Sequence, residues 1–222
     1  LGYGSENLFN KMRIQARLAR YRSFKSYSQF GEDAQIRRLV SGKSKFYLDI
    51  GSGHPVVGNN TFFLYKEGWN GVLVEPIPEM ANLSKLLRKR DICLNSAVSE
   101  TEKDITFYHF HPYQYSTLNE QHAKAALDKG IRLVSSKIIK TLSAKSLVNL
   151  LPAMPSVLSI DVEGNDFEIM MSLFNAGITP EVISIEDFKR EDTSEIHKGM
   201  IKFGYEISAR IYPSSIYSKR TS

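Results

Sequence analysis

Four acidic side chains stand at the ends of short apolar runs, where they could act together on a ligand. The runs are short and rich in strand-forming residues, which is typical of buried parallel strands. Because the carboxyl ends of parallel strands meet at one edge of a sheet, we expect the four carboxylates to line a single ligand site. The acids are Asp49, Glu75, Asp161 and Glu186.

A glycine turn follows the first of these runs and indicates a bound cofactor. Gly51 and Gly53 let the backbone pass close to a ligand. Glu75 ends the next run, where a carboxylate accepts hydrogen bonds from ribose hydroxyls. His54 and Pro55 interrupt the G-x-G-x-x-G pattern that holds a pyrophosphate, and a P-loop lysine is absent. The pattern favours S-adenosylmethionine over NAD; the alternative is a nucleotide-binding module without chemistry or an NAD-dependent oxidoreductase.

These motifs need a scaffold in which strands and helices alternate along the chain. Such alternation predicts an α/β fold with a mostly parallel sheet and helices on both faces. Asn60 or Thr61 is expected to cap the helix after the glycine turn. We expect strands at 46–50, 71–75, 92–98, 105–110, 157–161, 182–187 and, as the last strand, 205–211, with helices at 28–40, 62–67, 79–90, 119–129, 141–150, 167–175 and 196–203.

Residues 105–136 interrupt this alternation, and we interpret them as an insertion over the sheet that binds the substrate. His109 and His111 lie two apart on the expected strand and so share a face. They either contact the substrate or form ordinary sheet surface. Tyr113 and Tyr115 suit stacking on a sugar ring.

Length and charge indicate one domain with a basic N-terminal segment. The chain has 222 residues and a net charge of +5, and residues 1–26 contain six basic residues and one acidic residue. The remainder is neutral, which argues against a nucleic-acid partner. Residues 8–24 predict an amphipathic helix. That helix either covers the domain or a second copy in a homo-oligomer, links to upstream sequence, or contacts an anionic membrane.

Cysteine content and hydropathy predict a cytoplasmic protein. Cys93 is the one cysteine, so no internal disulfide can form, and a reducing compartment fits. No apolar run is long enough to span a membrane, and the first residues lack the pattern of a signal peptide. We therefore expect a cytoplasmic location and no transmembrane segment.

Eight short motifs, in their order and spacing, resemble those of one family. They are Tyr-Ser-Gln-Phe-Gly-Glu-Asp at 27–33, Tyr-Leu-Asp-Ile-Gly at 47–51, His-Pro at 54–55, Asn-Thr at 60–61, Gly-Trp-Asn-Gly at 68–71, Val-Glu-Pro at 74–76, Ile-Asp-Val-Glu-Gly-Asn-Asp at 160–166 and Ile-Glu at 185–186. Over about residues 27–190 the chain resembles the FkbM family of S-adenosylmethionine-dependent methyltransferases. Ser52-Gly53 departs from the Ala-x that the family commonly shows.

The resemblance implies a Rossmann-like, seven-stranded methyltransferase fold over 27–222, with 1–26 outside it. It also implies O-methylation of a hydroxyl on a sugar, a glycan or another hydroxylated metabolite. Asp49 would orient the glycine turn or reach the methionine amino group, Gln29 would bind the methionine carboxylate, and Asp161 would lie near the sulfonium. The remaining residues expected to bind the cofactor are Gly51, Ser52, Gly53, Asn60, Thr61, Glu75, Pro76, Ser96, Ala97 and Val98.

Methylation of a hydroxyl also requires removal of its proton, by a base or with a metal ion. His54 is either this base or a residue that caps its loop. Glu163 is a second candidate base, with formation of a turn as its alternative role, and Asp161 is also expected to be catalytic. Glu186 is expected on the substrate side. The favoured site is free of metal, although Asp161, Glu163, Glu186 and Asp187 offer the oxygen ligands that Mg²⁺ prefers.

Overall fold

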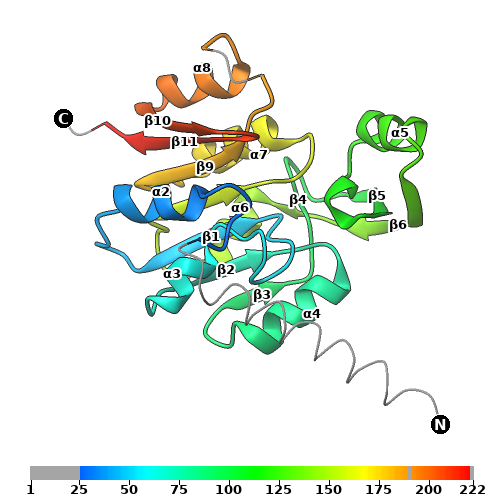
Figure 1. The fold of residues 1–222 in the computed structure, drawn as a ribbon, viewed down its shortest axis with the longest axis horizontal. Helices are drawn as coiled ribbons and strands as arrows, with labels where there is room; N and C mark the ends of the chain where they lie inside the picture. Colours follow the sequence, from blue (N-terminus) through cyan, green and yellow to red (C-terminus); the bar gives the residue numbers. More distant parts are fainter. Residues whose placement is uncertain (1–25, 190–191, 221–222) are drawn as a thin grey trace.

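The structure is a computed structural model that describes residues 26–189 and 192–220. Its centre is a seven-stranded sheet in the order β10-β11-β9-β8-β1-β2-β3 (Figure 1). Strands β9, β8, β1, β2 and β3 run parallel to their neighbours in this order. Strand β11 runs antiparallel to both β9 and β10. The strands are β1 (Phe46–Ile50), β2 (Asn70–Val74), β3 (Ile92–Leu94), β8 (Val157–Ile160), β9 (Val182–Glu186), β10 (Tyr205–Ile211) and β11 (Ser214–Lys219). The predicted mostly parallel sheet is confirmed.

Helices cover both faces of the sheet because successive strand residues point to opposite sides. Leu48 and Ile50 of β1 pack in one apolar cluster with residues of α6 (Ala144–Leu150), α7 (Asp166–Asn175) and α8 (Glu195–Lys202). Tyr47, between them, packs in the other cluster with residues of α2 (Glu32–Leu39) and α3 (Phe62–Lys66). Helix α4 (Pro78–Leu87) connects β2 to β3. The two-faced arrangement predicted from the sequence is confirmed.

Two predicted strands differ from the structure. The run at 92–98 is divided, because β3 ends at Leu94 and β4 (Val98–Ser99) pairs with β7 (Leu142–Ser143) outside the main sheet. Residues 205–211 are not the last strand, because β11 follows and lies between β9 and β10. The serine-rich sequence of β11 is not typical of a strand, so β11 was not predicted. In the structure its residues Ser215, Ile216 and Tyr217 are fully buried.

The expected insertion is a separate unit beside the sheet (green in Figure 1). It contains β5 (Asp104–His111), the 3-10 turn η1 (Tyr113–Tyr115), α5 (Glu120–Asp128) and β6 (Arg132–Lys140). Strands β5 and β6 form their own antiparallel two-stranded sheet. The strand at 132–140 was not predicted from the sequence, and the helix predicted from 141 begins at Ala144.

A buried network built around Arg88 fastens the loop between β1 and α3. The Arg88 side chain is fully buried, and its Nε donates to Asp91 Oδ2 at 2.7 Å. Its Nη2 donates to Tyr47 Oη at 2.7 Å and to Thr61 Oγ1 at 3.0 Å, and its Nη1 donates to Asn59 Oδ1 at 2.9 Å. One guanidinium therefore joins the end of α4, strand β1 and the loop that follows β1.

The side chain that caps α3 is that of Asn59 and not that of Asn60 or Thr61. Its Oδ1 accepts hydrogen bonds from the backbone N–H groups of Thr61 at 3.0 Å and Phe62 at 2.8 Å. Thr61 occupies the N-cap position, but its side chain makes no capping bond. The predicted cap by Asn60 or Thr61 is therefore wrong, because the Thr61 hydroxyl is used by the Arg88 network.

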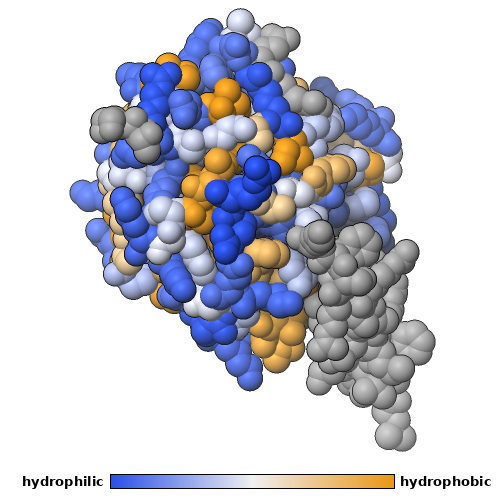
Figure 2. Space-filling view, turned by 60° about the vertical axis from the view of Figure 1, so that its left-hand side comes forward, coloured by the Kyte–Doolittle hydropathy of each residue, from blue (hydrophilic) through white to orange (hydrophobic). Residues whose placement is uncertain are grey.

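Within 26–189 and 192–220, no helix combines the length and apolar character needed to cross a bilayer. The face in Figure 2 is largely hydrophilic, with hydrophobic residues in small groups between. The predicted basic helix over 8–24, and the oligomer contact expected of it, lie outside the described residues.

We expect Arg88→Met to lower the free energy of unfolding by about 3–5 kcal/mol, because it leaves buried carboxylates without their cation. Urea unfolding followed by circular dichroism measures the change. Arg38→Met is the matched control, since Arg38 is exposed on α2 and should shift stability by no more than about 0.5 kcal/mol. Equal unfolding midpoints for the two variants would contradict this role of Arg88.

Candidate functional site

A cavity of about 950 Å³ lies at the carboxyl ends of β1, β2 and β8. These strands are neighbours in the sheet, so their ends meet at one edge, as expected for a ligand site. The insertion and the residues ahead of α2 complete its walls. Predicted site residues in its lining are Gln29, Gly51, Ser52, Gly53, His54, Glu75, Pro76, Ser96, Ala97, Val98, Tyr113, Asp161 and Glu163.

The glycine turn brings the ends of β1 and β8 into close contact. Gly51 has a φ of 74°, a backbone conformation that residues other than glycine rarely adopt. A Cβ atom at this position would lie 1.7 Å from the backbone oxygen of Asp161. The Gly51 N–H donates to the carbonyl oxygen of Val74 at 2.9 Å. Glycine is therefore required by conformation and by space, and the turn positions Asp161 at the cavity.

Glu75 is held rigidly in the cavity wall. It is 4% exposed, and its Oε2 and Oε1 accept hydrogen bonds from the N–H groups of Gly53 at 2.7 Å and Ile77 at 2.8 Å. Burial raises the pKa of Glu75 to about 7, and the two N–H groups oppose this rise. Each carboxylate oxygen retains a second lone pair, so Glu75 can also accept hydrogen bonds from ligand hydroxyls.

Ser52 presents a polar atom that the protein leaves unsatisfied. Its Oγ is buried and has no hydrogen-bond partner among the described residues. Buried polar atoms are normally paired, and Ser52 lines the cavity. A polar group of a bound ligand can supply the missing partner.

Asp49, Asn60 and Thr61 lie behind the glycine turn and outside the cavity lining. Asp49 Oδ2 accepts hydrogen bonds from Thr61 Oγ1 at 2.7 Å and Asn59 Nδ2 at 3.1 Å, and Asn60 Nδ2 donates to Ser159 Oγ at 3.2 Å. Of the two roles considered for Asp49, the geometry favours orienting the loop. Direct cofactor contact by Asn60 and Thr61 is not supported, because both side chains bond inward.

Gln29 reaches the cavity from a tight turn ahead of α2. Asp33 holds this turn by accepting hydrogen bonds from Tyr27 N at 2.6 Å and Ser28 Oγ at 2.9 Å. The N–H of Gly58 donates to the Tyr27 carbonyl at 2.8 Å, which ties the turn to the loop after β1. The Tyr-Ser-Gln-Phe-Gly-Glu-Asp motif thus places Gln29 and the exposed Phe30 at the mouth of the site.

His54 lines the cavity but its ring holds the loop. Its Nδ1 accepts hydrogen bonds from the N–H groups of Val56 at 3.2 Å and Val57 at 3.1 Å. With two donors directed at Nδ1, the proton of the neutral ring lies on Nε2. Neither nitrogen then offers a free lone pair for a substrate proton, so the geometry favours loop capping over a role as general base.

The insertion contributes Tyr113 to the cavity, and four other predicted substrate residues are absent from its lining. A Cβ on Gly53 would lie 3.3 Å from the Tyr113 ring, so this ring covers the glycine turn. His109 stacks on Phe107, which does line the cavity. Direct substrate contact is therefore not supported for His109, His111 or Tyr115, and Glu186 belongs to the cluster described next.

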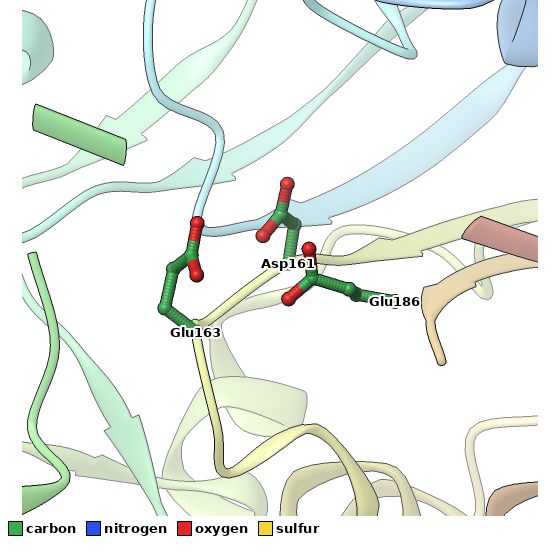
Figure 3. Close-up of side chains that lie close together, drawn as sticks. All are labelled: Asp161, Glu163 and Glu186. Atoms are coloured by element: carbon green, nitrogen blue, oxygen red, sulfur yellow. The ribbon is translucent and has the colours of Figure 1, made fainter. Parts of the chain in front are cut away.

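Asp161, Glu163 and Glu186 form a cluster in which one carboxylate oxygen from each residue lies within 4.8 Å of those from the other two (Figure 3). Glu163 has φ 56°, a strained conformation for a residue with a side chain. Asp166 stabilises this turn by accepting hydrogen bonds from Val162 N and Gly164 N, both at 3.1 Å. Thr117 Oγ1 donates to the Glu163 carbonyl at 2.7 Å, so the insertion also holds the turn.

The cluster brings three acidic groups together, which disfavours their ionised forms. Asp161 is reached by solvent through the cavity, but protein surrounds it on its other sides. Burial, and then the charge of Glu163, raise its pKa. Burial, and then Asp161 and Glu163, raise the pKa of Glu186 to about 10, whereas burial and Asp166 raise that of Glu163 to about 7. In the described part of the chain, no ion pair includes any of the three.

Asp187 does not join this cluster, although the sequence placed it there. Its Oδ2 accepts a hydrogen bond from Ser194 Oγ at 2.8 Å, and its Oδ1 accepts one from Lys189 N at 3.2 Å. Adjacent strand residues point to opposite sides, so Asp187 faces away from Glu186. The expected group of four acids is therefore corrected to three.

Comparison with known proteins identifies the family. The chain belongs to the FkbM methyltransferase family, since the family described as "Methyltransferase FkbM domain" matches residues 49–207. No curated protein sequence matches the chain.

Two solved structures are similar at low identity. One is a TehB-like SAM-dependent methyltransferase from Corynebacterium glutamicum, with 11% identity and a TM-score of 0.45, covering 97% of this chain and 98% of that one. The other is an O-methyltransferase from Bacillus cereus in complex with SAH, with 12% identity and a TM-score of 0.45, covering 93% and 88%. The family assignment rests on the sequence match.

We expect Gly51→Ala to destabilise the protein by much more than Gly58→Ala. Gly58 also has a positive φ, of 70°, but a Cβ there meets nothing within 4 Å. The control should therefore cost only the conformational strain, about 1–2 kcal/mol. Gly51→Ala must in addition displace the backbone of Asp161. Urea unfolding compares the two, and equal losses would show that the close contact of β1 and β8 is unimportant.

Proposed function

We propose that this protein transfers a methyl group from S-adenosylmethionine to a hydroxyl of a sugar, a glycan or another hydroxylated small molecule. The observation that carries the proposal is the rigid placement of Glu75 beside the glycine turn, in a chain of the FkbM methyltransferase family. A carboxylate in this position suits the two hydroxyls of a ribose.

The described residues fit such a cofactor. A cavity of about 950 Å³ is at the upper end of the range of about 300–1,000 Å³ for small-molecule sites, so it offers room for a second molecule. Ser52 Oγ lacks a partner, and Gly51 and Gly53 leave the backbone accessible. Glu75 would bind the ribose, Val98 and Ile77 would flank the adenine, and Gln29 would bind the methionine carboxylate.

When bound, S-adenosylmethionine supplies a methyl group on a positively charged sulfur, and the acceptor oxygen attacks this methyl group in line. Asp161 and Glu163 place two acidic groups on the nearby wall, and the positive sulfur of the cofactor would favour their ionised forms. Tyr113 and Phe30 both line the cavity, from different segments of the chain, and can pack on an acceptor ring. These side chains hold the two reactants together, which supplies much of the rate in a displacement reaction.

We expect Glu75→Ala to weaken binding of S-adenosylhomocysteine at least about ten-fold, because hydrogen bonds to a charged group contribute about 1.5–3 kcal/mol. Isothermal titration calorimetry measures the affinity, and circular dichroism checks the fold. Glu79→Ala is the control, because Glu79 is exposed on α4 and should bind normally. Unchanged affinity in a folded Glu75→Ala protein would remove the ribose assignment.

The reaction itself is tested with S-adenosylmethionine that carries a labelled methyl group. We expect label to enter one class of hydroxylated acceptor in a panel of sugars, glycosides and other polyols, with equimolar S-adenosylhomocysteine formed. Calorimetry should show binding of S-adenosylhomocysteine and none of NAD. Binding of NAD in place of S-adenosylhomocysteine would overturn the proposal. A cytoplasmic location and self-association through residues 1–26 remain predictions.

A further inference from the structure

The carboxylate cluster has a geometry that a cation can complete. Glu186 is only 7% exposed, and its Oε2 has no hydrogen-bond partner among the described residues. Figure 3 shows this carboxylate directed at Asp161, with Glu163 beside them. A buried polar oxygen without a partner is costly, and here it points into a group of two further carboxylates.

Protein groups do not neutralise the cluster. The ion pairs within 26–189 and 192–220 include none of the three acids. One carboxylate oxygen of each residue lies within 4.8 Å of the corresponding oxygens of the other two. These separations are short enough for the three carboxylates to share one ion.

The spacing suits a divalent cation that prefers oxygen ligands. Ca²⁺ binds oxygen at about 2.3–2.6 Å, so two ligands on opposite sides of it lie about 5 Å apart, whereas for Mg²⁺ the corresponding separation is about 4.2 Å. The observed limit of 4.8 Å fits the larger ion directly and the smaller ion after a slight inward movement. Carboxylates are also the ligands that Mg²⁺, Ca²⁺ and Mn²⁺ favour.

The local backbone supports such a site. The left-handed conformation of Glu163 is held on both sides, because its neighbours Val162 and Gly164 donate to Asp166 and its own carbonyl accepts from Thr117 Oγ1. Strained residues persist where the surrounding structure fixes them, and they gather at functional sites. The strain here brings the third carboxylate to the other two. We propose that Asp161, Glu163 and Glu186 bind one divalent cation of the Mg²⁺, Mn²⁺ or Ca²⁺ class.

The cation would have a direct role if the proposed methyl transfer is correct, and this step rests on that proposal. Asp161 and Glu163 line the cavity, so the acceptor hydroxyl can become a further ligand of the ion. A bound cation lowers the pKa of such a hydroxyl. Its proton leaves to water, the oxygen forms a bond to the methyl carbon, and the electron pair of the broken carbon–sulfur bond stays on sulfur.

The site is tested without cofactor or acceptor, so its failure and that of the proposed methyl transfer are distinguishable. The full chain is stripped with EDTA, desalted and titrated with MnCl₂ by calorimetry, then with CaCl₂ and MgCl₂. We expect one cation per chain, with affinity for Mn²⁺ at least about ten-fold lower in Glu186→Gln. Glu195→Gln, at an exposed position on α8, is the matched control and should bind normally.

Thermal unfolding shows whether a variant loses cation binding because a ligand is missing or because its fold is damaged. In EDTA, Glu186→Gln should unfold at the same temperature as the parent or higher, because it replaces an acid whose ionised form is disfavoured by its neighbours with a neutral group of similar shape. Mn²⁺ should raise the unfolding temperature of the parent and leave that of the variant unchanged. Glu163→Gln, at a less buried position, should repeat this pattern. Absence of heat and of a thermal shift in the parent at millimolar cation, or equal affinity in Glu186→Gln, would overturn the proposal.

Discussion

The buried guanidinium of Arg88 is the interaction on which the site depends. It joins Asp91, Tyr47, Asn59 and Thr61 behind the glycine turn, and Thr61 passes the connection on to Asp49. Burial raises the pKa of Asp49, and the charge of Arg88 opposes that rise. Arg88 therefore compensates the buried acidic groups behind the loop between β1 and α3 and holds that loop in place. This fixes the glycine turn, which faces the cavity.

The neighbouring part of the same sheet edge has an excess of acidic groups. Asp161, Glu163 and Glu186 each have one carboxylate oxygen within 4.8 Å of the others, and no ion pair in the described chain includes them. At an effective dielectric constant of about 20, two unit charges at about 5 Å repel by roughly 3 kcal/mol. Such a wall favours cationic ligands. A sulfonium cofactor and a divalent ion both meet this requirement, so the two proposals have the same electrostatic origin.

Much of this arrangement could be predicted from local sequence. The glycine turn, the acid Glu75 at the end of the second strand and Asp161 at the end of the fourth follow from short patterns with a direct physical meaning. The division of Glu186 from Asp187 also had a signal, since neighbouring strand residues alternate in direction. Treating the two acids as one group was the error.

Other features depend on contacts that a sequence pattern does not contain. Arg88 stands among Lys85, Lys89 and Arg90, and nothing in their order shows which base is buried. Strand β11 has three serines and is defined by its place between β9 and β10, which is a tertiary choice. The loop-holding bonds of His54 likewise arise from the path of the backbone at Val56 and Val57.

The crystal structure of the complex with S-adenosylhomocysteine tests the central claim most directly, since it shows both the place and the direction of the cofactor. The account predicts that the ribose hydroxyls lie within hydrogen-bond distance of Glu75 and that the sulfur lies at the Asp161 side of the cavity. A nucleoside bound elsewhere, or a sulfur directed away from the carboxylate cluster, would contradict it.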